Sequence, residues 1–303
     1  MNGILLVDKP KGMTSYAVVH HIKKIFKPRR AGHTGTLDPF ATGVLPVCLD
    51  SATKIIPFLD ENYKEYEATL KLGVTTDTMD ETGKITYVRE VGEISLNDIE
   101  LVLAGVKSEA SQVPPMYSAL KYRGKRLYEL ARNGFEVERS PRTVNIEELR
   151  ILDFRSPLLK FLVKCSRGTY VRVLGADIGR KIGCGGHLVD LRRLKSGNFK
   201  IEDTITIEEI MSGEINLISI DTALSHLKRI YATKNTSIRI RDGEQINKSY
   251  LDTLNIPEFD AGEALAFYHD TTLISVSRAR FSSHDFDRIE DKEIIFTHLR
   301  VFN

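Results

Sequence analysis

The sequence predicts an α+β fold with an extensive mixed or antiparallel sheet. Polar and apolar residues alternate along 65–72 and 159–165, which is the period of a strand with one buried face. Apolar residues recur at helical spacing along 18–25 and 99–106. Strands and helices follow one another without a strict strand–helix–strand repeat, which favours the α+β class.

The predicted elements follow in chain order. A strand is expected at 4–7, and Ser15 is the expected N-cap of the first helix. A short strand at 47–49 precedes the alternating strand at 65–72. Ser95 and Asp98 have the spacing of a capping box and should open the second helix. A third helix is expected to follow Tyr170 and to end at Gly183.

Near residue 228 the pattern changes to short strands separated by turn residues. The expected strands are 237–241, 264–268, 273–277 and 293–296. They predict a small β-rich, barrel-like module. We therefore expect two domains, 1–228 and 229–303.

Composition is that of a globular protein. The chain has 303 residues, of which 42% are hydrophobic and 28% charged. No apolar run reaches the 18 or so residues that cross a bilayer, and no signal-peptide pattern begins the chain, so we expect a cytoplasmic protein without membrane contact. Cys48, Cys165 and Cys184 lie far apart, which predicts buried thiols and neither a disulfide nor a zinc site.

Positive charge is concentrated in two segments, although the net charge is only +2. The first is 23–30, directly before a glycine-rich stretch. The second is 114–142, with seven Lys or Arg residues against three Glu. Either run alone could be a solvated face, but two runs, one of them beside the glycine-rich stretch, favour a phosphate-binding surface.

The glycine-rich stretch, 31–46, holds one carboxylate, Asp38, among glycines, threonines and prolines. Its glycines allow positive φ and close approach to a ligand. Pro39 fixes its own φ and pushes Asp38 toward an extended conformation. An isolated Asp-Pro pair is usually a simple turn. The composition of the whole stretch predicts instead a carboxylate that is held in place.

Other chemistries are poorly supported by the sequence. The Gly-Lys steps at 83–84 and 124–125 are not followed by Ser or Thr, so a P-loop is excluded. Asp38 lacks the second aspartate of a DxD motif. The eight histidines show no HExxH spacing, and no grouped ligands predict a metal site.

Five segments together resemble the TruB-type tRNA pseudouridine-55 synthases. They are the Asp38 stretch (31–46), Lys9-Pro10-Lys11-Gly12-Met13-Thr14-Ser15, Lys64-Glu65-Tyr66-Glu67-Ala68, Pro115-Met116-Tyr117-Ser118-Ala119-Leu120-Lys121 and Gly168-Thr169-Tyr170-Val171-Arg172. They stand in family order and spread the resemblance over about 2–228. The turn at 242–246 more weakly resembles the PUA domain that ends many of these synthases. A structural β-domain is the alternative there.

The resemblance implies that the chain isomerises uridine to pseudouridine in tRNA, with Asp38 as the essential carboxylate. Arg172 would supply its counter-charge, and Tyr66 would lie against the target base. The reaction moves C1′ from N1 to C5 of the uracil, so no redox cofactor or metal is implied. Asp38 could attack covalently or remove a proton, and both routes stay open at this point.

The implied substrate is the T-arm stem-loop of tRNA, with uridine 55 extruded from its stack. His33 would occupy the vacated space. The implied substrate-binding residues also include Lys9, Tyr117, Tyr170, Lys121, Arg123, Lys125 and Arg126. The last four belong to 114–142, which we interpret as an inserted RNA-binding arm. No obligatory protein partner is implied, and a monomer is expected. The alternative is a non-catalytic tRNA-binding and folding protein on the same scaffold.

Overall fold

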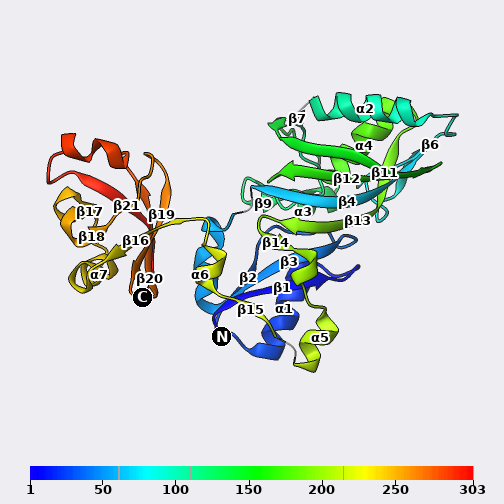
Figure 1. Ribbon diagram of the computed structural model, residues 1–303. Helices are drawn as coiled ribbons and strands as arrows, with labels where there is room; N and C mark the ends of the chain where they lie inside the picture. Colours follow the sequence, from blue (N-terminus) through cyan, green and yellow to red (C-terminus); the bar gives the residue numbers. More distant parts are fainter. Residues whose placement is uncertain (61, 109–110, 214, 303) are drawn as a thin grey trace. The chain divides into compact units, whose positions relative to one another are not determined.

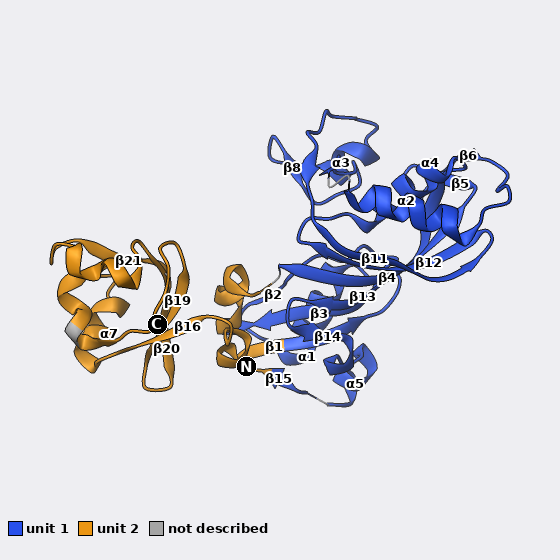
Figure 2. Cartoon of the chain, turned by 45° about the horizontal axis from the view of Figure 1, so that its top comes forward, with its two compact units in different colours: residues 1, 5–50, 61–217 blue, residues 2–4, 51–60, 218–303 orange. Residues whose placement is uncertain are grey.

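A computed structural model describes residues 1–60, 62–108, 111–213 and 215–302. The chain divides into two compact units (Figure 2). The first unit comprises 1, 5–50 and 61–217, and the second comprises 2–4, 51–60 and 218–303. This division differs from the expected one, in which a single boundary follows residue 228. Residues 218–228 and two N-terminal segments, 2–4 and 51–60, belong to the same unit as the C-terminal strands. No helix in the described ranges is long and apolar enough to cross a membrane.

A large mixed sheet forms the centre of the first unit. Its strands are β1 (Gly3–Lys9), β2 (Ala31–His33), β3 (Thr42–Leu49), β4 (Tyr63–Leu72), β11 (Ile146–Arg155), β12 (Leu158–Ser166), β13 (Gly186–Ser196), β14 (Phe199–Lys200) and β15 (Leu217–Ile218). The order is β11-β12-β4-β13-β3-β1-β15, with β14 beside β13 and β2 beside β3. β13 runs parallel to β3 and antiparallel to β4. The predicted class and mixed sheet are confirmed.

Three longer helices accompany this sheet. They are α1 (Ser15–Phe26), α2 (Leu96–Ser108) and α4 (Val171–Ile182). Figure 1 shows α2 and α4 together on one side of β4 and β12. The Ser95–Asp98 capping box and the end of α4 at Gly183 are confirmed. The N-cap of α1 is Thr14 and not Ser15, because the Thr14 hydroxyl accepts the Ala17 N–H at 3.0 Å while the Ser15 side chain is used elsewhere.

Short elements complete the first unit. They are β5 (Val74–Thr76), β6 (Ile85–Val88), β7 (Ser111–Gln112), β8 (Lys121–Tyr122), β9 (Lys125–Arg126), α3 (Leu127–Arg132), β10 (Arg142–Thr143), η2 (Ile201–Asp203) and α5 (Ile207–Ser212). Strands β5 and β6, β7 and β10, and β8 and β9 form two-stranded pairs. All three cysteines are buried, as predicted.

The second unit is β-rich, as predicted. Its elements are η1 (Asp50–Phe58), α6 (Ile220–Ala223), β16 (Lys228–Ala232), α7 (Lys234–Arg241), β17 (Ile246–Asn247), η3 (Lys248–Thr253), β18 (Leu254–Asn255), β19 (Ala264–His269), β20 (Thr272–Ala279), η4 (Ser283–Arg288) and β21 (Ile294–Val301). The strands form one sheet in the order β17-β21-β20-β19-β16-β18. Phe259, Phe267 and Phe296 are buried in its core.

One of the four strands predicted in this unit is wrong. Residues 237–241 belong to helix α7, although Ile238 and Ile240 alternate with arginines as in a strand. The Thr233 hydroxyl caps this helix by accepting the Thr236 N–H. The helix then buries Thr236, Ser237 and Ile240, which share one helical face. A segment of five residues fits both the two-residue period of a strand and the 3.6-residue period of a helix. The Thr233 cap favours the helix.

Candidate active site

Asp38 lies in the loop between β2 and β3, and the backbone of this loop is fixed on both sides of it. The side chains of Leu37 and Phe40 are buried in the core. The Ser15 hydroxyl donates to the Leu37 carbonyl at 3.1 Å and accepts the Leu37 N–H at 2.9 Å. The Asp38 carbonyl accepts the Ala41 N–H at 3.1 Å. The sequence-based expectation of a held carboxylate agrees with this geometry.

Arg172, in the first turn of α4, binds the Asp38 carboxylate. Its Nε donates to Oδ2 of Asp38 at 2.8 Å, and its Nη2 lies 3.4 Å from Oδ1. The remaining N–H groups donate to the carbonyls of Thr78 at 2.7 Å and Tyr117 at 2.8 Å. Asp80 lies 3.4 Å from Nη1. The guanidinium is thus held on all sides and orients Asp38 rigidly.

The pKa of Asp38 is set by opposing effects. Burial raises the pKa of this carboxyl above its usual range, and the charge of Arg172 opposes the rise. The nearby carboxylate of Asp80 adds to the rise in the pKa of Asp38, since like charges disfavour each other. The ionised state of Asp38 therefore depends on Arg172.

Asp80 is a residue that the sequence analysis missed. Its side chain is 5% exposed, and Oδ1 accepts from the Thr78 hydroxyl at 2.8 Å and from the Thr82 N–H at 2.9 Å and hydroxyl at 2.6 Å. These bonds close a turn whose Thr78 carbonyl accepts a hydrogen bond from Arg172. The cluster of Asp and Thr before Gly83 is typical of a turn, and this is the signal that the sequence offers for Asp80. Its contact with α4 is long-range, so sequence could not reveal it.

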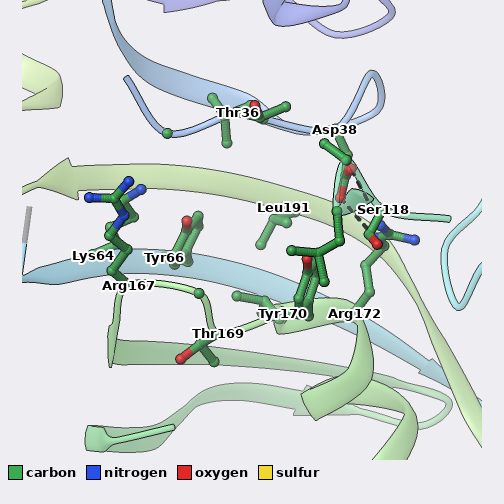
Figure 3. A pocket seen from close by; sticks show the side chains of 16 residues that line it. Thr36, Asp38, Lys64, Tyr66, Ser118, Arg167, Thr169, Tyr170, Arg172 and Leu191 are labelled. Atoms are coloured by element: carbon green, nitrogen blue, oxygen red, sulfur yellow. Dashed lines mark hydrogen bonds and ion pairs between the residues drawn. The ribbon is translucent and has the colours of Figure 1, made fainter. Parts of the chain in front are cut away.

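A cavity of about 310 Å³ opens beside Asp38. In Figure 3, Asp38 and Arg172 lie at one end, while Tyr66 and Leu191 lie nearer the middle. Tyr66 points inward from β4 and is 7% exposed, and burial raises the pKa of its hydroxyl. Tyr170 also lines the cavity, and its backbone is held by the Gln112 side chain. This volume lies at the small end of ligand sites.

The other end of the cavity is cationic. Figure 3 places Lys64 and Arg167 together there, away from the Asp38–Arg172 pair. Lys64 is 8% exposed. A carboxylate at one end and cations at the other complement a nucleotide, because its sugar is neutral and its phosphate is anionic. Neither Lys64 nor Arg167 was among the predicted site residues.

Lys9 lies behind the Asp38 loop and not in the cavity. Its side chain is fully buried, and its ammonium donates to the carbonyls of Pro10 at 2.9 Å, Met13 at 2.6 Å and Pro39 at 3.3 Å. Burial lowers the pKa of Lys9 to about 8. This arrangement contradicts the expected substrate contact of Lys9, because all three donors are used inside the protein. Lys9 instead ties the 10–13 turn to Pro39.

The structure places two further predicted residues at the edge of the site. His33 ends β2, pairs with Val47 of β3, and lies outside the lining of the cavity. Tyr117 contacts the site through its backbone carbonyl, which accepts from Arg172. The next three residues, 118–120, line the cavity.

The predicted arm, 114–142, continues from this lining into an exposed hairpin. Its basic residues Lys121, Arg123, Lys125 and Arg126 are all exposed on β8, β9 and their turn. Arg123 and Gly124 have positive φ, which closes the turn. Tyr128 lies beneath Arg126 and Arg132, with ring distances of 5.9 and 5.6 Å. The hairpin presents cations and aromatic rings outward, but none of the four predicted residues lines the cavity.

The mixed sheet, the Asp38–Arg172 pair and the tyrosine-lined cavity beside that pair together point to a pseudouridine synthase. Two family models match the chain: "TruB family pseudouridylate synthase (N terminal domain)" over 23–171 and "tRNA pseudouridylate synthase B C-terminal domain" over 172–230. The chain belongs to the tRNA pseudouridine synthase B family, and the expected family and enzyme class are confirmed.

Whole-chain relatives agree with this assignment. The chain is 44% identical to tRNA pseudouridine synthase B of Geotalea uraniireducens, with 92% of both chains covered. It is 40% identical to that of Syntrophus aciditrophicus, with 100% of this chain and 99% of the relative covered. Among solved structures, a Cbf5-Nop10-Gar1 complex gives a TM-score of 0.73 at 27% identity, covering 99% of this chain and 85% of the other. A structure described as an H/ACA RNP bound to a substrate RNA containing 2′-deoxyuridine gives 0.73 at 25%, with the same coverage.

Proposed function

We propose that Asp38 is the catalytic carboxylate of a synthase that converts uridine 55 in the T loop of tRNA to pseudouridine. The observation that carries this proposal is the Asp38–Arg172 pair. Arg172 is 3% exposed, whereas the Asp38 side chain is 36% exposed and lines the cavity. A non-catalytic tRNA-binding protein gains nothing from a carboxylate that faces a polyanion, so the geometry favours catalysis over that alternative.

The proposed reaction breaks the C1′–N1 bond of uridine and forms a C1′–C5 bond. The C5 proton is lost and N1 regains a proton, so the base keeps its composition. Asp38 serves either as a nucleophile toward C1′ or as a base toward the sugar, and both roles need its ionised form. Tyr66 packs its ring against the base and directs its hydroxyl at the reacting groups.

The target uridine must leave its stack to enter a cavity of this size. We propose that the cationic end, Lys64 and Arg167, receives a phosphate of the extruded nucleotide. His33 lies before the loop and would stack in the vacated position. The exposed hairpin with Lys121 and Arg126 binds the T-arm backbone, because single-stranded and looped RNA is recognised largely by phosphates and stacking.

We further propose that the enzyme acts as a cytoplasmic monomer and needs no protein partner or cofactor for the reaction. We propose that residues 229–303, which make up most of the second unit, form a PUA-like RNA-binding domain. Its β-rich sheet supports this. The catalytic domain then corresponds to 1–228.

The direct test is to incubate unmodified tRNA with the purified protein and no added cofactor, and to map pseudouridine along the product. The proposal expects modification at position 55. Modification at another position, or tRNA binding without modification, would overturn the assignment of substrate or of activity, respectively.

A further inference from the structure

Arg193 on β13 is among the largest side chains that are completely buried, at 0% exposure. Burying a guanidinium is costly unless its charge and donors are compensated. Its neighbour Arg192 differs in both respects, because its side chain is 35% exposed and forms an ion pair with Asp8 at 2.7 Å. Among the described residues, no ion pair of Arg193 is found. Stability alone therefore does not account for this buried cation.

The position of the Arg193 guanidinium is fixed. Its Nε donates to the Val44 carbonyl at 2.7 Å. Its backbone lies against Gly43, where an added Cβ would come within 2.2 Å of the Arg193 carbonyl oxygen. The backbone of Arg193 and one of its guanidinium donors are therefore held in place.

The Arg193 guanidinium faces Tyr66. The two residues are direct partners in the antiparallel pairing of β13 with β4, so their side chains share one face of the sheet. The charge of Arg193 acts on the Tyr66 hydroxyl and opposes the effect of burial on the pKa of that hydroxyl.

The terminal nitrogens of Arg193 have unused donors. Both Nη1 and Nη2 are buried, and neither reaches full hydrogen-bond geometry with a described residue, although the guanidinium lies close enough to the Tyr66 hydroxyl to interact with it. Nη1 would lie 3.1 Å from a Cβ built on Gly35, so the backbone of the Asp38 loop passes directly over it. Buried donors without a partner are costly, and they are found where a ligand or a reacting group completes them.

We propose that Arg193 is a positioning residue for Tyr66. Its guanidinium engages a lone pair of the Tyr66 oxygen, so the hydroxyl proton points into the cavity toward the target nucleotide. Arg193 does not line the cavity and acts only through Tyr66. This inference rests on the proposed function, because it assigns Tyr66 to the reacting face.

The test compares Arg193→Met, Arg193→Lys and the matched control Arg192→Met, which removes the adjacent guanidinium on the same strand. The single-turnover rate at saturating unmodified tRNA and the tRNA affinity are measured. Arg193→Met should slow the rate about tenfold or more and leave affinity within about twofold. Arg193→Lys should recover most of the rate, and Arg192→Met should resemble the parent.

A second measurement reads Tyr66 without turnover. In protein labelled with ¹³Cζ-tyrosine, the Tyr66 signal is assigned by its loss in Tyr66→Phe. We expect this signal to shift in Arg193→Met, to return toward the parent position in Arg193→Lys, and to stay in place in Arg192→Met. An Arg193→Met variant with the parental rate and Tyr66 signal would overturn the inference. Should Arg193→Met fail to fold, Arg193→Gln replaces it as the variant without the charge. A Tyr66 signal that is displaced equally in Arg193→Lys and Arg193→Gln would then overturn the inference.

These outcomes are separable from failure of the proposed function. If the parent makes no pseudouridine but the Tyr66 signal responds to Arg193, the proposed function fails while the structural coupling stands. If the parent is active and the signal is unresponsive, only the role of Arg193 fails.

Discussion

Nε of Arg172 lies 2.8 Å from Oδ2 of Asp38, yet Arg172 is 3% exposed and Asp38 is 36% exposed. The cation is enclosed by the protein and bound to two carbonyls, while the carboxylate keeps a free face toward the cavity. The counter-charge of Asp38 therefore comes from the protein interior, and the Asp38 carboxylate stays accessible from the cavity.

Replacing Arg172 should shift the pH dependence of the reaction. Burial raises the pKa of Asp38 and Arg172 opposes that rise, so Arg172→Ala raises the pKa further. Asp38 must be ionised, so the acid limb of the rate profile should move to higher pH, and most activity near neutral pH should disappear. Single-turnover rates at saturating tRNA from about pH 5 to pH 9 measure this. Arg172→Lys, which keeps the charge, should shift the limb less. A profile unchanged in Arg172→Ala contradicts the pairing.

Asp80→Asn should move the same limb in the opposite direction. The Asp80 carboxylate raises the pKa of Asp38, so its neutralisation should lower that pKa and extend activity to lower pH. The maximal rate should fall about tenfold, because Arg172 loses an ion pair and its supporting turn loosens. Asp77→Asn is the control, since Asp77 caps the same turn from the exposed side through the Lys84 N–H. Equal behaviour of the two variants would contradict a role for Asp80 at the site.

The exposed hairpin should govern affinity more than chemistry. The variant changes Lys121, Arg123, Lys125 and Arg126 together to alanine. Binding should weaken, and the slope of log K against log salt should flatten by about one unit for each RNA phosphate that these side chains no longer neutralise. The rate at saturating tRNA should change less. Alanine at Arg150 and Arg155, exposed on β11, serves as the control. A parental affinity and salt slope in the quadruple variant would show that the hairpin does not hold RNA.

Gly43→Ala should destabilise the first unit. Gly43 has a φ of +102°, and a Cβ there would lie 2.2 Å from the Arg193 carbonyl oxygen and 2.8 Å from its nitrogen. Gly12→Ala is the matched control, because Gly12 has a φ of +87° but no atom within 4 Å of the added Cβ. Backbone strain alone should cost Gly12→Ala about 1 kcal/mol, and the clash should cost Gly43→Ala about 3 kcal/mol or more. Urea unfolding measures both, and equal destabilisation would contradict the close approach of β3 and β13.

Local patterns predicted much of the fold. The alternation along β4 and β12 and the capping box at Ser95 are properties of neighbouring residues, so the sequence displays them directly. The strand expected at 237–241 was wrong. Five residues fit the period of a strand and that of a helix equally well, and the threonine cap at Thr233 stabilises helix α7. The N-cap of α1 shifted to Thr14 because Ser15 makes a long-range contact with Leu37.

The residues of the candidate site were predictable where they belong to a sequence motif. The structure brings Asp38, Tyr66, Tyr170 and Arg172 together, as expected from the resemblance. The structure also shows that Asp80 contacts Arg172 and that Arg193 pairs with Tyr66. No local sequence pattern predicts these two contacts, because a turn and the pairing of distant strands create them. For Lys9 the motif was misleading. The resemblance implied a contact with the substrate, but the Lys9 ammonium binds backbone carbonyls behind the Asp38 loop.

The carboxylate of Asp38 is the centre of the account, and Asp38→Asn tests it most directly because the substitution removes the charge and keeps the size. The measurement is the amount of pseudouridine at position 55 of unmodified tRNA after incubation with each protein, with tRNA affinity determined in parallel. We predict no pseudouridine from Asp38→Asn and an affinity within about tenfold of the parent. Substantial pseudouridine formation by this variant would contradict the account.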